Sequence, residues 1–92
     1  DLENYPDIIL TKKGTTTIEF FIEVETTDSV NKNEATSQWL KYANEINATF
    51  YILVPAISKT ITLNLCKELG INARIGLYHQ DAFGNITNII FE

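Results

Sequence analysis

The sequence predicts an α/β domain in which a mixed β-sheet is flanked by helices. Short apolar segments suited to strands alternate with two segments of helical periodicity, in the order strand, strand, helix, strand, helix, strand, strand. Apolar residues make up 45% of the chain and charged residues 21%, which suffices for a hydrophobic core. The length of 92 residues suits a single domain covering 1–92.

The chain begins with two predicted strands. The first covers about residues 7–11 and follows Pro6, because proline is tolerated at the start of a strand but not inside it. Lys12-Lys13-Gly14 predicts the turn, and the second strand covers about residues 16–25. The run Phe20-Phe21-Ile22 indicates burial on both faces of the sheet, so we expect this strand to be central.

A helix is predicted at about residues 30–46, after the capping residues Thr26-Thr27-Asp28-Ser29. Gln38 and Tyr42 are four residues apart and therefore lie one above the other on its surface. Apolar residues recur at a spacing close to that of one buried helix face: Val30, Ala35, Trp39, Leu40, Ala43 and Ile46.

The apolar run 49–54, ended by Pro55, predicts a buried strand parallel to the second one, reached through the helix as a crossover. A second helix is expected at 58–69, because Ile61, Leu65 and Leu69 follow at four-residue spacing. Gly70 stands where a helix often ends on glycine.

The end of the chain predicts two antiparallel strands. The first covers about residues 73–78, residues 81–85 form a turn, and the last strand covers 86–91.

Composition and net charge indicate what this domain can bind and where it is located. The net charge of −5 disfavours broad adhesion to nucleic acid, but it is compatible with a metal site that contacts phosphate locally. The absence of methionine predicts a domain excised from a larger protein or a processed product. No signal peptide or membrane-length run is visible, so we expect no membrane partner and a cytoplasmic location. The lone Cys66 excludes an internal disulfide and is expected in the core.

Three acidic residues mark the two ends of the predicted hairpin. Asp7 begins the first strand, while Glu23 and Glu25 lie two apart near the end of the second and project to the same face. Pairing of the strands would bring Asp7 next to both glutamates. Like charges disfavour each other's ionisation, and a hard divalent cation with oxygen ligands would relieve this repulsion. The alternative is that these are ordinary solvated acids at strand ends.

The ordered combination of Pro6-Asp7, Glu23-Val24-Glu25 and Gln38…Tyr42 resembles the PD-(D/E)xK nuclease superfamily, in a variant with ExE and a QxxxY motif. The resemblance covers residues 5–55. It implies a restriction-endonuclease-like core that lacks the usual N-terminal helix. It also implies metal-dependent hydrolysis of phosphodiester bonds in nucleic acid, with DNA favoured.

The resemblance also implies roles for single residues. Asp7 and Glu23 would bind Mg²⁺ or Mn²⁺, and Glu25 would be a third ligand or a general base. Gln38 and Tyr42 would orient the site or the phosphate backbone of the substrate. The family usually has lysine at the position of Glu25, and Lys41 is a candidate for a displaced cation. Other domains of the parent protein are expected partners, and a homodimer stays open.

The sequence also allows other interpretations of these residues. A module that kept the fold but lost catalysis, and now serves protein–protein interaction or assembly, would explain Glu25 and the net charge. Gln38 and Tyr42 would then be an ordinary half-buried helix face. Trp39 is expected in the core, and His79 in a solvated loop, with no nucleophile motif near it.

Overall fold

The strands and helices of this chain are seen in a computed structural model that describes residues 6–92; the first five residues of the predicted domain lie outside the described part. Residues 6–92 contain five strands: β1 (Ile8–Thr11), β2 (Ile18–Val24), β3 (Thr49–Pro55), β4 (Arg74–Gln80) and β5 (Ile86–Phe91). The helical segment between β2 and β3 has three parts: α1 (Lys32–Glu34), a π-helical turn (Ala35–Trp39) and α2 (Leu40–Glu45). A 3₁₀ turn (Ala56–Ser58) leads into α3 (Lys59–Leu69).

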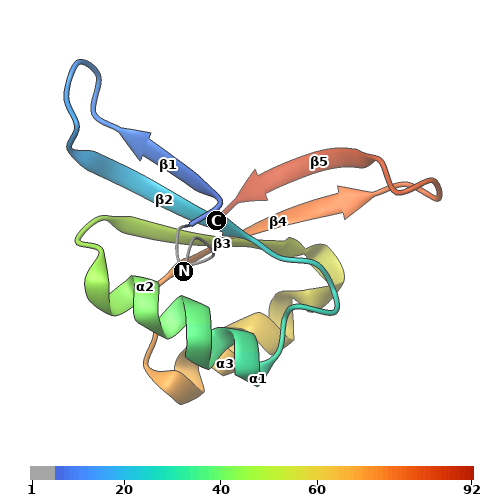
Figure 1. The fold of residues 1–92 in the computed structure, drawn as a ribbon. Coiled ribbons are helices and arrows are strands. Elements are labelled where there is room, and N and C mark those ends of the chain that lie inside the picture. The colour runs from blue at the N-terminus through green and yellow to red at the C-terminus, as the bar shows by residue number, and fades with distance from the viewer. Residues whose placement is uncertain (1–5) are drawn as a thin grey trace.

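The strands form one mixed sheet in the order β1-β2-β3-β4-β5. β2, β3 and β4 are parallel, whereas β1 and β5 pair antiparallel with their neighbours. Both crossovers step across the sheet in the same direction, and crossovers between parallel strands are right-handed, so both helical segments lie on the same face (Figure 1). The predicted mixed α/β class is confirmed.

The core lies between the helices and this face of the sheet. Phe21 of β2 and Phe50 of β3 stack with ring centroids 4.5 Å apart, and Trp39 is fully buried above the sheet. Trp39 is thus a core residue, as predicted. Cys66 of α3 is also buried, and burial raises the pKa of its thiol to about 11. In the part of the chain that the structure describes, no helix combines the length and apolar character that a membrane span requires.

The first helix differs from the prediction at its start. It begins at Lys32 rather than at residue 30, and its N-cap is Asn31, whose side chain accepts a hydrogen bond from the backbone N–H of Glu34 at 2.8 Å. The expected capping residues are used elsewhere, because the Ser29 hydroxyl accepts from the backbone N–H of Thr26 at 2.8 Å. These hydroxyls therefore close a turn before the helix.

The predicted apolar stripe of α3 is wrong at one position. Ile61 is 48% exposed, and Thr62 is buried in its place. The Thr62 hydroxyl donates to the carbonyl of Ser58 at 2.7 Å, which satisfies the polar group inside the helix and allows its methyl group to pack. Gly70 ends α3 in the left-handed region at φ 67°, as expected.

The first strand of the last hairpin extends further toward the turn than predicted. β4 extends to Gln80, so that His79 is an exposed strand residue and does not lie in a loop. Its partner across the sheet is Asn88, next to a register shift. The turn is confirmed, with Gly84 at φ 84° and the Asp81 carboxylate accepting from the backbone N–H groups of Phe83 and Asn85.

Candidate functional site

The hairpin of β1 and β2 brings Asp7 to Glu23. Ile8 pairs with Ile22, so the residue before β1 lies beside the end of β2. The backbone N–H of Asp7 donates to Glu23 Oε1 at 3.2 Å, and Asp7 Oδ2 accepts from the backbone N–H of Val24 at 2.8 Å. Asp7 is exposed and Glu23 is buried. Two acids sixteen residues apart thus meet at one end of the sheet.

Glu25 directly follows β2 and is held by three other parts of the chain. Its side chain is 2% exposed. Oε2 accepts from Trp39 Nε1 at 3.0 Å, and Oε1 accepts from the Ser29 hydroxyl at 2.5 Å. Its backbone carbonyl accepts from the Tyr78 hydroxyl at 2.7 Å. The helical segment and the loop before it therefore fix the carboxylate, and β4 fixes the backbone of the same residue.

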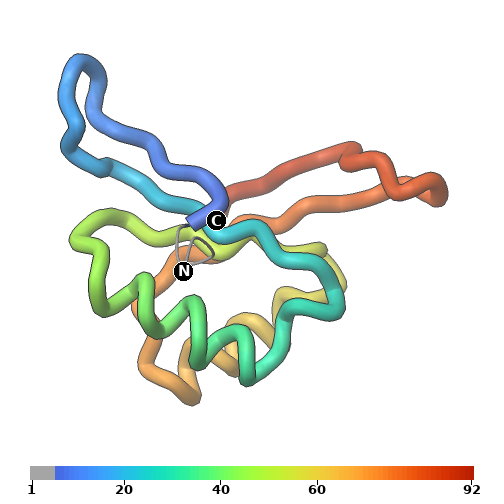
Figure 2. Tube along the Cα trace, viewed as in Figure 1, coloured from blue at the N-terminus to red at the C-terminus, as the bar shows by residue number. Residues whose placement is uncertain are grey.

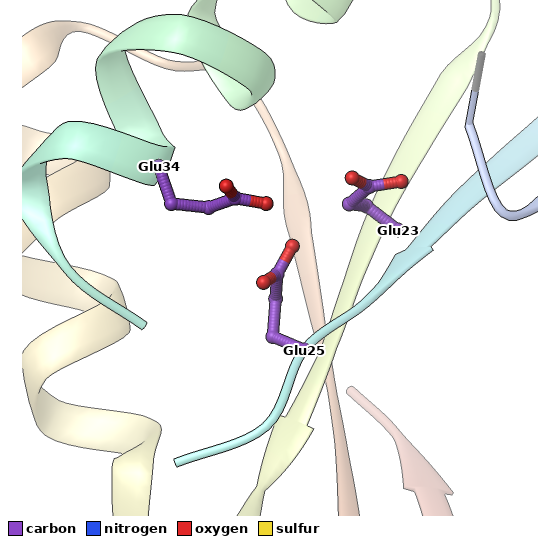
Figure 3. Close-up of side chains that lie close together, drawn as sticks. All are labelled: Glu23, Glu25 and Glu34. Carbon is purple, nitrogen blue, oxygen red and sulfur yellow. The ribbon is translucent and has the colours of Figure 1, made fainter. Parts of the chain in front are cut away.

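A third glutamate, Glu34 of α1, completes the cluster. Carboxylate oxygens of Glu23, Glu25 and Glu34 lie within 4.8 Å of one another, and Figure 3 shows the three side chains pointing toward a common centre. Glu23 and Glu25 are buried, while Glu34 is half-buried. The cluster therefore joins the end of β2 to the start of the helical segment.

The π-helical turn explains how two residues of this segment reach Glu25 together. Trp39 donates to the Glu25 carboxylate, and Glu34 lies against the same group. Residues five apart point about 140° apart in a regular α-helix. A π turn, in which the N–H of Leu40 donates to the carbonyl of Ala35, is wider and brings positions five apart toward one face. The bulge thus turns Glu34 and Trp39 to the same side.

Burial, together with repulsion from neighbouring carboxylates, raises the pKa values of Glu23 and Glu25. The pKa of Glu23 is raised to about 8. Burial is the largest cause, and the neighbouring charges of Asp7 and Glu25 contribute in the same direction. Burial also raises the pKa of Glu25 to about 7, although the hydrogen bonds from Ser29 and Trp39 act in the opposite direction. At neutral pH the cluster therefore holds protons that solvated glutamates would have lost.

Tyr42 lies close to the same acids. It is buried, and its ring meets the edge of Phe50 with centroids 6.4 Å apart. Burial raises the pKa of its hydroxyl to about 12, and the charges of Glu23 and Asp7 contribute in the same direction. The hydroxyl therefore keeps its proton at neutral pH.

The other two predicted site residues have a different environment. Gln38 and Lys41 are half-buried, and neither side chain forms a hydrogen bond or an ion pair within residues 6–92. The structure thus brings Glu23 and Glu25 together and bonds Asp7 to Glu23, but Asp7 is not part of the group that Glu23 and Glu25 form with Glu34, contrary to the expectation that it lies next to both glutamates. It gives the Gln38 and Lys41 side chains no contact of this kind. Their roles stay predictions.

Glu34 is the residue that sequence reasoning missed. Asn31 and Glu34 have the spacing of a capping box, in which the acid would serve the helix terminus. The Asn31 half of this pattern is present, whereas the Glu34 carboxylate points into the cluster. An acid in the first turn of a helix that follows an ExE strand is the signal that could have identified it.

A shallow hollow of about 260 Å³ lies along the same end of the sheet. Thr27, Pro55, Tyr78 and His79 are among the residues that line it. Because Tyr78 also bonds to the Glu25 backbone, the hollow adjoins the acidic cluster through one side chain. The carboxyl ends of parallel strands are where α/β folds commonly bind ligands.

The cluster offers a defined donor set. Carboxylate oxygens are the ligands that hard divalent cations such as Mg²⁺ prefer, and the three converging groups would bind a cation by releasing the protons that they hold at neutral pH. The same groups can also share protons among themselves without an ion.

No protein-family model matches this chain, and neither a curated protein nor a solved structure is significantly similar to it.

Proposed function

We propose that this chain is a metal-dependent nuclease domain of the restriction-endonuclease-like type, which hydrolyses phosphodiester bonds of DNA with Mg²⁺ or Mn²⁺. The observation that carries the proposal is the convergence of Glu23, Glu25 and Glu34 within 4.8 Å, with Asp7 hydrogen-bonded beside Glu23. Three acids converge there, and Asp7 adds a fourth acid next to Glu23, although its carboxylate lies outside the converging group. The resemblance implies a metal site at Asp7, Glu23 and Glu25. Repulsion among them would be relieved by a divalent cation.

The residues of the cluster have distinct roles in this proposal. Asp7, Glu23 and Glu34 would hold the cation, which when bound would polarise the phosphodiester and lower the pKa of water. Glu25 has a pKa of about 7, close to the value that suits a general base at neutral pH. The protonated Tyr42 hydroxyl is a hydrogen-bond donor for a carboxylate or a phosphate oxygen.

The order of elements also supports the proposal. The PD dipeptide precedes β1, the ExE acids end β2, and the QxxxY residues lie on the helical segment that leads to the parallel strand β3. This is the succession that the resemblance predicts for its motifs. An acidic chain is compatible with it if the contact with the DNA backbone is local and depends on the metal.

A second candidate function rests on the surroundings of Glu25. Trp39 and Ser29 bind both of its oxygens in the folded chain, as they would in a module where this residue serves structure alone. A catalytically inactive, nuclease-like module for protein–protein interaction or assembly would keep such a network. The two candidates differ in whether the cluster binds a divalent ion.

The test measures metal binding and cleavage with the same preparation. Mn²⁺ binding is followed by isothermal titration calorimetry, and cleavage of supercoiled plasmid DNA is followed in Mg²⁺ and in Mn²⁺. We expect Asp7→Ala and Glu23→Gln to reduce cleavage by about 100-fold or more, because each removes a charged ligand. Glu19→Gln is the matched control, since it removes one exposed acid from the same strand outside the cluster.

The possible results separate the candidates. Cleavage that is lost in both site variants and kept in Glu19→Gln supports the nuclease. Metal binding without cleavage of plasmid, single-stranded DNA or RNA favours the inactive module. A chain that neither binds Mn²⁺ nor cleaves nucleic acid overturns the proposal.

A further inference from the structure

β5 is an edge strand whose outer side has no strand partner in the described part of the chain. It is the last strand in the sheet order, at the outside of the β4–β5 hairpin (Figures 1 and 2). The backbone N–H of Glu92 donates to the carbonyl of Ile75 at 3.1 Å, so Glu92 directs its backbone groups toward β4. This direction alternates along an antiparallel strand, and Ile89 and Phe91 therefore direct their N–H and C=O groups away from the sheet.

The composition of β5 is that of an interior strand. Ile90 pairs with Leu77, on the side of the sheet that the helices cover. Ile89 pairs with Tyr78 on the opposite side, the open face, which no described helix covers, and Phe91 points the same way (Figure 1). The three β5 side chains are between 44% and 50% exposed. Apolar side chains on both faces are typical of strands that have a neighbour on each side.

The β5 edge also lacks most of the features that prevent pairing between molecules. Exposed edges are usually blunted by lysine, proline, bulges or a very short strand. Residues 82–91 contain no charged residue and no proline, and the irregularity of β5 lies beside Ile86, next to the turn. β1, the other edge strand, has four residues and a charged residue directly before and after it.

A second copy of the chain matches this edge. With a twofold axis beside Ile90, Ile89 of each copy pairs with Phe91 of the other. Both residues direct their backbone groups outward, so each of these pairs exchanges two N–H···O bonds, about four in all. The same register sets Ile90 opposite its own copy and Asn88 opposite Glu92, so no like charges meet.

Charge and closure favour the same arrangement. The net charge of −5 makes two copies repel over most of their surfaces, but Glu92 is the one charged residue in the paired stretch 88–92. Its carboxylate already forms an ion pair with Lys59 at 3.0 Å. Pairing of β5 with β1 of another copy would leave a free edge at each end and continue without limit, whereas the twofold pair closes.

We propose that two copies of this chain form a dimer through antiparallel pairing of their β5 strands about Ile90, which joins the two sheets into one. The twofold axis is perpendicular to the sheet, so the helices of both copies lie on the same side. The pairing does not involve the acidic cluster, because β3 and β4 separate β5 from β2. It is therefore independent of the proposed nuclease activity.

Sedimentation equilibrium of the full chain measures the association. A pairing of about five residues a side is smaller than a standard interface, so we expect a Kd of roughly 10–100 μM. Ile89→Lys should raise the Kd by about tenfold or more, because it sets an ammonium group opposite an apolar side chain at the edge. Ile86→Lys is the matched control, since Ile86 is 55% exposed in the same strand but lies outside the paired stretch. It should change the Kd less than about twofold.

A cysteine at the axis tests the register. Facing residues of a non-hydrogen-bonded antiparallel pair have Cα atoms about 4.5 Å apart, which suits a disulfide. Ile90→Cys should therefore form a covalent dimer with oxidised glutathione under native conditions, and Ile86→Cys should not. The wild type controls for Cys66, whose thiol is buried. Circular dichroism verifies that every variant is folded.

Three results would overturn the inference. One is a wild-type chain that stays monomeric at about 500 μM, well above the expected Kd. Another is a dimer that Ile89→Lys and Ile86→Lys weaken equally, because the interface then lies elsewhere. The third is equal cross-linking of Ile90→Cys and Ile86→Cys, or none in either, which contradicts pairing about Ile90.

Discussion

Glu25 shows how the fold accommodates a buried carboxylate. Two neutral donors, Trp39 Nε1 and the Ser29 hydroxyl, each bind one oxygen of a carboxylate that is almost fully buried. Such hydrogen bonds offset part of the unfavourable transfer of the charge from water. The indole has a second task besides filling the core, because it aims the carboxylate at Glu23 and Glu34.

Replacing Trp39 by Phe removes this donor and keeps an aromatic ring. We expect the free energy of unfolding at pH 8 to fall by about 1–3 kcal/mol, because a buried acceptor loses its partner. Urea denaturation of the wild type and of Trp39→Phe measures the change. The same substitution in a Glu25→Gln background should have a smaller effect, since an amide oxygen is a weaker acceptor than a carboxylate. Equal effects in both backgrounds would contradict the role assigned to the bond.

Glu23 makes the stability of the chain depend on pH. Its pKa is raised from 4.5 to about 8 in the folded state, so between these values the folded chain holds a proton that the unfolded chain has lost. The stabilisation is fully present below about pH 4.5 and is lost as the pH rises through about 8. We expect the free energy of unfolding to decrease by a few kcal/mol from about pH 5 to about pH 8.

Glu23→Gln tests this dependence, because glutamine cannot titrate. Urea denaturation across the same pH range should give a flatter profile for the variant than for the wild type, with the variant relatively more stable at the alkaline end. Two profiles of equal slope would show that Glu23 is not the responsible group.

At the scale of elements, the helical segment between β2 and β3 is the part that assembles the site. Its π turn adds one residue to the circumference of the helix and is fixed at both ends by core residues, Ala35 and Trp39. π turns are rare and often occur at functional sites. Here the turn allows α1 to present Glu34 while α2 keeps Tyr42 over Phe50.

Deleting the exposed Thr36 should convert this turn into regular α-helix. The residues before the deletion would then rotate by about 100° relative to those after it, which carries Glu34 away from Glu25. We expect Mn²⁺ to bind at least about tenfold more weakly in calorimetry, since one converging carboxylate is lost. Thr36→Ala keeps the register and serves as control. Circular dichroism verifies that the deletion variant folds, and an unchanged affinity would contradict the role of the π turn.

For the whole molecule, the topology sets the two surfaces that matter. Two right-handed crossovers in the same direction place both helical segments on one face, and the opposite face remains open. The acids lie on the covered side, at the carboxyl end of β2. The acidic cluster and the open apolar face are thus separated by the sheet itself.

A cation held by residues from three segments should stabilise the whole fold, because only the folded chain brings these segments together. Mn²⁺ at about 100 times its Kd should add about 2.7 kcal/mol, which corresponds to a rise in Tm of roughly 10 °C or more. Differential scanning fluorimetry measures the shift, and chelation with EDTA should reverse it. Glu19→Gln should retain the shift and Glu23→Gln should lose most of it. An equal shift in both variants would place the ion elsewhere.

The sequence by itself determined the class of the fold, the succession of strands and helices, and the pairing of Asp7 with Glu23. Hydrophobic periodicity and turn residues are local, and the short β1–β2 hairpin allows almost no freedom in which residues meet. The predicted last strand, 86–91, has the same bounds in the structure.

Only the tertiary structure decided which further groups join these acids. Glu34 enters through a π turn that has no simple sequence signature, and Glu25 becomes buried because Trp39 and Ser29 satisfy its oxygens. Both depend on side-chain contacts between the end of β2, the loop after it and the helical segment, which propensities do not encode. The open face has the same origin, because the side on which a helix packs follows from the direction of each crossover and not from the helix's own residues.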